Sequence, residues 1–310
     1  MTIAFISHPD CLLHENSPGH PECPQRLRAI QDQLLATGLD QALRHYEAPL
    51  ATPEQLGRAH DPDYVEAVFA AAPDQGTRPL DPDTAMNPHS LQAARRAAGA
   101  AILGVDLVMN GETRAAFCSV RPPGHHATRN RAMGFCIFNN VAVAAAHALI
   151  EHGLQRVAIA DFDVHHGNGT EDIFAAEPRV LLCSSFQHPY YPHTGADTRT
   201  SHIVNVPLPA GTRSEAFQTA ISTHWLPALM EFRPQLLLIS AGFDGHLEDE
   251  LAQFMLTEAD YHRVTEALRA VAEEHCGGRI VSCLEGGYAL PALGRSVAAH
   301  LRALLGMAAV

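Results

Sequence analysis

The chain has 310 residues, of which 46% are hydrophobic and 18% are charged, and its formal net charge at pH 7 is −13 with histidine counted as neutral. This composition supports a large folded core and excludes an intrinsically disordered polymer. The acidic balance argues against nucleic-acid binding through phosphate contacts and is compatible with cationic substrates.

Apolar residues at helical spacing predict helices along the chain. The first stripe consists of Leu27, Ile30, Leu34 and Leu35 and ends at Gly38. Later helices are expected after the Asp-Pro pair at 61–62, over 88–110 up to a glycine, over 139–152, and over 257–275, where Thr257 and Asp260 predict a capping box.

Five short apolar runs are predicted as buried strands: 115–120, 157–162, 180–184, 236–241 and 279–284. Their alternation with helices is typical of an α/β fold with a central, mostly parallel sheet and helices on both faces. Without internal repeats or a long linker, residues 1–310 are expected to form a single domain.

The cysteines and the N-terminus indicate the compartment. Seven cysteines are scattered without a Cys-x-x-Cys pair, which is typical of reduced thiols in a cytoplasmic protein. The start, MTIAFISHPD, has no signal-peptide pattern, and no run reaches the roughly 18 apolar residues of a membrane span. We expect a cytoplasmic protein without a membrane partner, and the sequence leaves open whether it forms a homo-oligomer.

Four predicted strands are followed by segments that carry ionisable groups: RPPGHHA, DFDVHHGNG, GFDGH and EGGY. Sites in open α/β sheets form beyond the carboxyl ends of the strands. Because one such ending can arise by chance and four cannot easily do so, we expect these segments to converge on one site.

The segment DFDVHHGNG carries the strongest signal. Asp161, Asp163 and His165 alternate with period two, so an extended backbone directs them to one side. With Asp244, which follows another strand, Asp163 and His165 would neutralise a divalent ion and leave a position for water, as in a catalytic zinc site. The alternative is a turn in which these side chains only cap the next helix.

Two further segments offer proton donors and acceptors. His125 and His126 follow Pro122-Pro123-Gly124, a stiff turn that would hold both imidazoles near an activated water; the alternative is a histidine-rich surface loop. Tyr288 follows two glycines and could offer its phenol to an oxyanion, although a packing role is the simpler interpretation of a lone tyrosine.

The motifs HPECPQRL, RPPGHHA, GFCIFNN, DFDVHHGNGTEDIF, SAGFD and LEGGY span nearly the whole chain in this order. In this combination the sequence resembles the arginase/deacetylase superfamily, and specifically the zinc-dependent histone deacetylases and their bacterial relatives. The resemblance implies an open α/β fold and hydrolysis of acyl-lysine or of acylated small amines.

The resemblance also implies roles for individual residues. Zinc would be held by Asp163, His165 and Asp244. His126 would be the general base, His125 would give electrostatic or acid support oriented by Asp161, and Tyr288 would bind the substrate carbonyl. The remaining implied positions are the tunnel residues Gly134, Phe135, Tyr191 and Leu251, Arg26 near an inner acetate-release channel, and a potassium site made by Asp161, Ser184 and Ser185 with the backbone of Asp163 and His165.

The sequence departs from the family pattern in four places. Asn168 stands where class I members carry aspartate, which is the class II pattern. His193 stands where glycine is usual and affects the tunnel rim. His246 is unusual and is expected to be a rim contact or a solvated side chain. Leu251 replaces the gatekeeping glutamate of polyamine-specific relatives, which weakens the case for a polyamine substrate.

Three functions therefore stay open. The first is an acyl-amide hydrolase acting on acyl-lysine, or alternatively on acetylpolyamines or other small amides. The second is an arginase-like ureohydrolase, which needs a second metal, whereas Asp244 is followed by Gly245 and His246 rather than by a second aspartate. The third is a non-catalytic binder of acylated amines, which would be expected to lose His126 or Tyr288.

Overall fold

A computed structural model describes residues 2–309. Its centre is an eight-stranded sheet in which every pairing is parallel. The strands, in sheet order, are β2 (Leu43–Glu47), β1 (Ile3–Ser7), β5 (Ala115–Cys118), β10 (Ile280–Leu284), β9 (Leu236–Ala241), β6 (Val157–Asp161), β7 (Val180–Gln187) and β8 (Ile203–Leu208).

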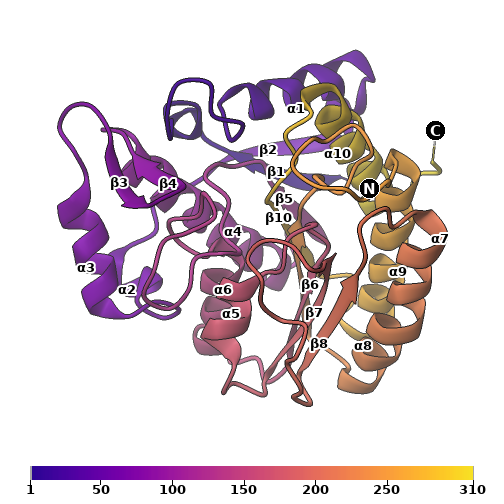
Figure 1. Ribbon diagram of the computed structural model, residues 1–310. Coiled ribbons are helices and arrows are strands. Elements are labelled where there is room, and N and C mark those ends of the chain that lie inside the picture. The colour runs from indigo at the N-terminus through magenta and orange to yellow at the C-terminus, as the bar shows by residue number, and fades with distance from the viewer. Residues whose placement is uncertain (1, 310) are drawn as a thin grey trace.

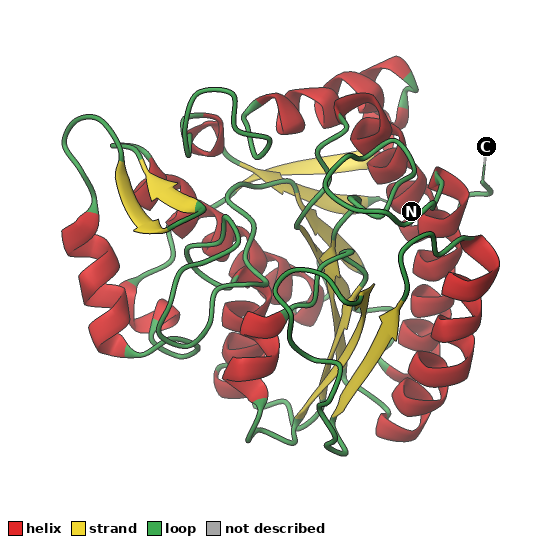
Figure 2. Cartoon of the chain, viewed as in Figure 1, coloured by secondary structure: helices red, strands yellow, loops and turns green. Residues whose placement is uncertain are grey.

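Helices cover both faces of this sheet (Figures 1 and 2). One face carries α7 (Ser214–Ala220), α8 (Leu226–Phe232), α9 (Glu258–His275) and α10 (Leu290–Leu304), with α1 (Gln25–Ala36) packed on α10. The other face carries α4 (Ser90–Met109), α5 (Asn140–Ile150) and α6 (Asn168–Phe174). Beside that face lie α2 (Pro53–Leu56), α3 (Pro62–Ala71) and the hairpin of β3 (Arg78–Asp81) and β4 (Thr84–Met86).

This architecture confirms the predicted α/β class with helices on both faces. All residues of β6, β9 and β10 are buried, as expected for central parallel strands covered on both sides. The capping box of Thr257 and Asp260 opens α9, and Gly38 takes the left-handed conformation (φ 68°) after α1.

Some local expectations differ from the structure. Leu35 is exposed although its spacing placed it on the buried stripe of α1, because the burial of that helix follows Leu27, Ile30 and Leu34. Strands β1, β2 and β8 were not predicted. No helix within residues 2–309 has both the length and the apolar character that crossing a membrane requires.

Candidate active site

The four strands that precede the ionisable segments are neighbours in the sheet. Their chain order is β5, β6, β9 and β10, and their spatial order is β5-β10-β9-β6. Because all four are parallel, their carboxyl ends lie along the same edge. The segments RPPGHHA, EGGY, GFDGH and DFDVHHGNG therefore converge, as the sequence predicts.

The three predicted metal ligands meet at this edge. His165 Nδ1 lies 3.1 Å from Asp163 Oδ1 and 3.2 Å from Asp244 Oδ2. Both carboxylates are buried, and the three ligand atoms lie within 4.8 Å of one another. None of these side chains caps α6, whose first residue follows Gly167 without a side-chain cap, so the capping interpretation of this segment is wrong.

Backbone groups hold the free carboxylate oxygens in place. Gly286 N donates to Asp163 Oδ2 at 2.8 Å, and Val164 N donates to Asp244 Oδ1 at 3.0 Å. A Cβ atom on Gly286 would lie 2.0 Å from Asp244 Oδ2, so only glycine allows this approach. The first glycine of EGGY therefore contacts the predicted metal ligands directly.

Each of the two histidines has its own partner. His125 Nδ1 donates to Asp161 Oδ2 at 2.9 Å, and His126 Nδ1 lies 2.7 Å from Asn168 Oδ1. Both imidazoles are buried and their ring centroids are 4.0 Å apart. A solvated surface loop is therefore excluded for this pair.

The pKa values of the two histidines are shifted in opposite directions. Burial disfavours the charged form of His125, but the carboxylates of Asp163 and Asp161 outweigh it and raise its pKa to about 10. Burial lowers the pKa of His126 well below its usual value, and the neighbouring charges of His125 and His165 lower it further. The structure thus favours a charged His125 and a neutral His126 at neutral pH.

A cavity of about 210 Å³ opens onto these groups. It is lined by His125, His126, His165 and Tyr288 and by the four residues expected in the tunnel, Gly134, Phe135, Tyr191 and Leu251. Gly134 has φ 57°, and a Cβ atom there would lie 2.3 Å from His126 Cδ2. Glycine at this position therefore lets the cavity wall contact the imidazole.

Tyr288 is held between two side chains and by its own backbone. Its ring lies 4.9 Å from the guanidinium carbon of Arg26 and 6.0 Å from the ring of Phe135. Arg26 is buried behind Tyr288, where its Nε donates to Gly287 O at 2.7 Å. Burial raises the pKa of the Tyr288 phenol well above its usual value, so the hydroxyl stays a donor at neutral pH.

Several contacts of the site were not found in the sequence. Asp249 Oδ2 accepts from Tyr288 N at 2.6 Å and from Ala289 N at 3.0 Å, and so anchors the tyrosine loop. Its neighbours Glu248 and Glu250 are equally acidic, and no local pattern singles out Asp249.

Two other missed residues are acidic as well. Glu285 accepts from Gly124 N at 2.6 Å and from His125 N at 3.1 Å, and burial raises its pKa to about 7. Asp83 lines the cavity and accepts from Gly134 N at 3.0 Å. Glu285 begins the motif EGGY directly after a predicted strand, and this position is the sequence signal that could have identified it as a site residue.

Two unusual histidines lie away from the cavity. His246 is buried, with Nε2 3.5 Å from Glu258 Oε1 and Nδ1 accepting from Glu248 N. The expectation of a rim contact or a solvated side chain is therefore wrong, because α9 covers this residue. His193 is exposed, with φ 63°, and does not line the cavity.

The fold and the site are together those of a hydrolase of the α/β class. Comparison with known proteins identifies the family of hydrolases. Residues 20–304 match the model of the histone deacetylase domain. The chain therefore belongs to the histone deacetylase family, whose members hydrolyse amide bonds.

Individual relatives agree with this assignment. A histone deacetylase-like amidohydrolase from Pseudomonas aeruginosa is 40% identical, over 87% of this chain and 73% of the relative. The mouse polyamine deacetylase HDAC10 is 38% identical, over 99% of this chain and 48% of the relative. The crystal structure of the HDA15 HD domain superposes with a TM-score of 0.93 at 35% identity, over 100% of this chain and 91% of that one.

Proposed function

We propose that this chain is a zinc-dependent amidohydrolase that removes acetyl or other acyl groups from lysine side chains, with residues 1–310 acting as one catalytic domain. The observation that carries the proposal is the single cavity that receives the predicted metal ligand His165, both buried histidines and Tyr288. A non-catalytic binder would have no use for this complete set of proton donors and acceptors.

The donor set fits one divalent cation. Asp163 and Asp244 direct carboxylate oxygens toward the same nitrogen of His165, and burial together with Asp163 raises the pKa of Asp244 to about 6. Two crowded, buried carboxylates are relieved by a cation, and two oxygens with one imidazole nitrogen suit catalytic zinc. When bound, zinc would polarise the substrate carbonyl and make a water molecule more acidic.

His126 is suited to the role of general base. The amide of Asn168 donates through Nδ2 to Met133 Sδ at 3.4 Å, so its Oδ1 faces His126 and accepts the Nδ1 proton. This hydrogen bond fixes the tautomer in which Nε2 carries the free lone pair. Nε2 can then take a proton from the attacking water and later give it to the leaving amine.

His125 and Tyr288 would stabilise the charge that develops in the reaction. His125, held charged by Asp161, places a positive charge next to the base. Tyr288 lines the cavity with a phenol that stays protonated, so it can donate to the oxyanion that forms on the substrate carbonyl.

Potassium would be held on the other side of Asp161. The hydroxyl oxygens of Ser184 and Ser185 are buried without a hydrogen-bond partner among the described residues. Ser184 pairs with Asp161 in the register of β6 and β7, and an unpaired buried oxygen beside a buried carboxylate suits a hard monovalent cation. Such an ion would stabilise the segment from Asp161 to His165 and not take part in proton transfer.

The cavity walls favour a linear aliphatic substrate. Phe135, Tyr191 and Leu251 offer aromatic and aliphatic surface, which suits the methylene chain of lysine. Acetylpolyamines are the second candidate, because Asp83 places a carboxylate on the cavity wall and HDAC10, a relative, is named a polyamine deacetylase.

Acetate release separates these substrates. We expect the zinc-loaded enzyme to hydrolyse an acetyl-lysine peptide with a higher kcat/KM than an acetylpolyamine. Leu251→Glu should move this ratio toward the polyamine, because a second carboxylate would then attract its cationic nitrogen. No acetate from either class of substrate, with zinc bound, would disprove the proposed function.

A further inference from the structure

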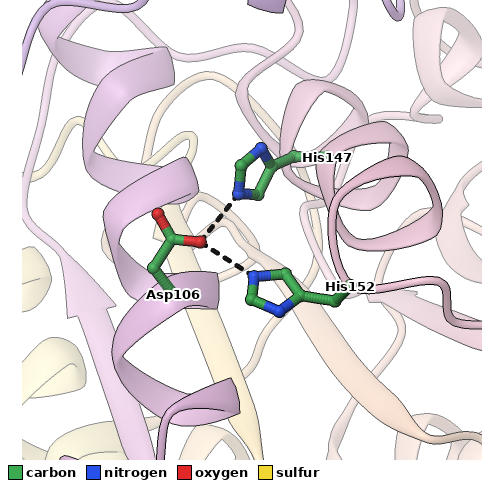
Figure 3. A group of neighbouring side chains, drawn as sticks. All are labelled: Asp106, His147 and His152. Carbon is green, nitrogen blue, oxygen red and sulfur yellow. Dashed lines mark hydrogen bonds and ion pairs between the residues drawn. The ribbon is translucent and has the colours of Figure 1, made fainter.

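A second group of metal-ligating side chains lies outside the candidate active site. Asp106 of α4, His147 of α5 and His152, just after α5, point toward one another (Figure 3). The Nε2 atoms of both imidazoles lie 2.8 Å from Asp106 Oδ1, and the three ligand atoms lie within 4.8 Å of one another. Helices α4 and α5 end where β5 and β6 begin, so this cluster is at the opposite edge of the sheet from the active site.

We propose that Asp106, His147 and His152 form a second metal site, which binds a divalent transition-metal ion such as Zn²⁺ or Ni²⁺. Two imidazole nitrogens and one carboxylate oxygen are the donor set that such ions prefer, whereas Mg²⁺ and Ca²⁺ require mainly oxygen ligands. The Asp106 side chain is 40% exposed and that of His152 is 19% exposed. An ion can therefore reach the site and complete its coordination with water.

The charges around the cluster also match a divalent cation. Arg58, which contacts His147 of the cluster, also forms ion pairs with two glutamates. Its Nη2 lies 3.3 Å from Glu54 Oε1 and 2.6 Å from Glu151 Oε1. With Asp106 there are three negative groups and one positive group, and neutral imidazoles leave a formal charge of −2. This negative charge attracts a divalent ion to the site before Arg58 and its two glutamate partners move.

Arg58 also opposes the metal. Its Nη1 lies 3.2 Å from His147 Nδ1, and because a guanidinium only donates, Nδ1 accepts and Nε2 carries the proton. A metal on Nε2 requires the other tautomer, with the proton on Nδ1 facing Arg58. Arg58 must therefore turn away when the ion binds, and its two exposed glutamate partners can follow it into solvent. The metal-free form is then a hydrogen-bonded link between α4 and α5 that an ion replaces.

Counting zinc per chain tests the site directly, independently of the proposed function. We expect the zinc-saturated wild type to hold two equivalents, and Asp106→Asn to hold one. The asparagine oxygen still accepts from both imidazoles, so this variant keeps the helix link and loses only the charged ligand. His152→Ala should lose the same equivalent, and both variants should keep wild-type hydrolysis rates. Asp40→Asn is the matched control, because Asp40 pairs with His45 at 3.0 Å but lacks the three-ligand arrangement found at Asp106. This variant should leave the zinc count unchanged.

Two results would overturn the proposal: a wild type that binds no zinc beyond the equivalent lost in His165→Ala, or Asp106→Asn binding as much zinc as the wild type. If the catalytic zinc were absent, the cluster would still give one equivalent that Asp106→Asn removes, so the two failures are distinguishable. Arg58→Ala should tighten the second equivalent by about threefold, the effect of removing one like charge about 7 Å from the ion, across the His147 ring, in water. Weaker binding in that variant would contradict the opposing role of Arg58.

Discussion

Replacing Tyr288 with phenylalanine removes one hydroxyl group and leaves the aromatic ring in place. The ring contacts with Arg26 and Phe135 do not involve the hydroxyl, and the backbone amide of residue 288 keeps its bond to Asp249. We therefore expect the variant to fold normally, to bind zinc as the wild type does, and to lose only the oxyanion donor.

The expected loss in kcat is about 10²–10³-fold, the usual worth of one oxyanion donor, or about 2.7–4 kcal/mol. Tyr288 is only partly buried, so a water molecule can partly replace the phenol, which favours the lower end of this range. KM should change little, because the donor acts mainly on charge that develops after substrate binding.

The pH dependence gives a second check. The pKa of Tyr288 is raised well above its usual value, so the phenol is fully protonated through the neutral range. The ratio of wild-type to variant kcat should therefore be constant between about pH 6 and pH 9. A ratio that falls as pH rises within this range would mean that the phenol ionises there, contrary to the structure.

Steady-state acetate release from an acetyl-lysine peptide, together with zinc content, measures all of these quantities. Tyr191→Phe is the matched control, because Tyr191 lines the same cavity with its ring 5.2 Å from that of His126 and has no proposed donor role. A kcat for Tyr288→Phe within about threefold of the control, with zinc retained, would refute the assignment.

The remaining predictions concern the base, the metal and the tyrosine loop. Asn168→Asp places a carboxylate on the Nδ1 side of His126 and should raise the pKa of His126 by about 1–3 units. Since the base works only when unprotonated, the acidic limb of kcat/KM should move to higher pH. An unmoved limb would exclude this contact. His165→Ala should abolish activity and release the catalytic zinc, measured by metal content; normal zinc and turnover would contradict its role. Asp249→Asn, with an amide oxygen in place of a carboxylate, should lower kcat by about tenfold through misplacement of Tyr288 and keep zinc, whereas lost zinc would indicate general unfolding.

Local sequence determined which segments carry the chemistry. The apolar runs at 157–162 and 236–241 set two central strands, and the polar residues that follow them are of the types that ligate metals. The predicted extended backbone ends at Asp161, however: Asp163 and His165 lie in a bent segment after β6, where Asp161 Oδ1 accepts from Asp163 N and Asp163 Oδ1 accepts from His165 N. The α/β class follows from the alternation of strand and helix signals.

Tertiary structure decided which of these segments meet and what supports them. The sheet order β5-β10-β9-β6 brings EGGY between RPPGHHA and GFDGH, and no local pattern encodes that order, because strand pairing depends on how distant helices pack. Asp249 holds the tyrosine loop through backbone amides 39 and 40 residues away in the chain. His246, two residues after the predicted metal ligand Asp244, is buried near Glu258 at the start of α9 instead of at the cavity. In each case the residue type alone does not indicate the partner. The contact forms because the chain buries its apolar surface around one sheet, and this packing brings distant segments together.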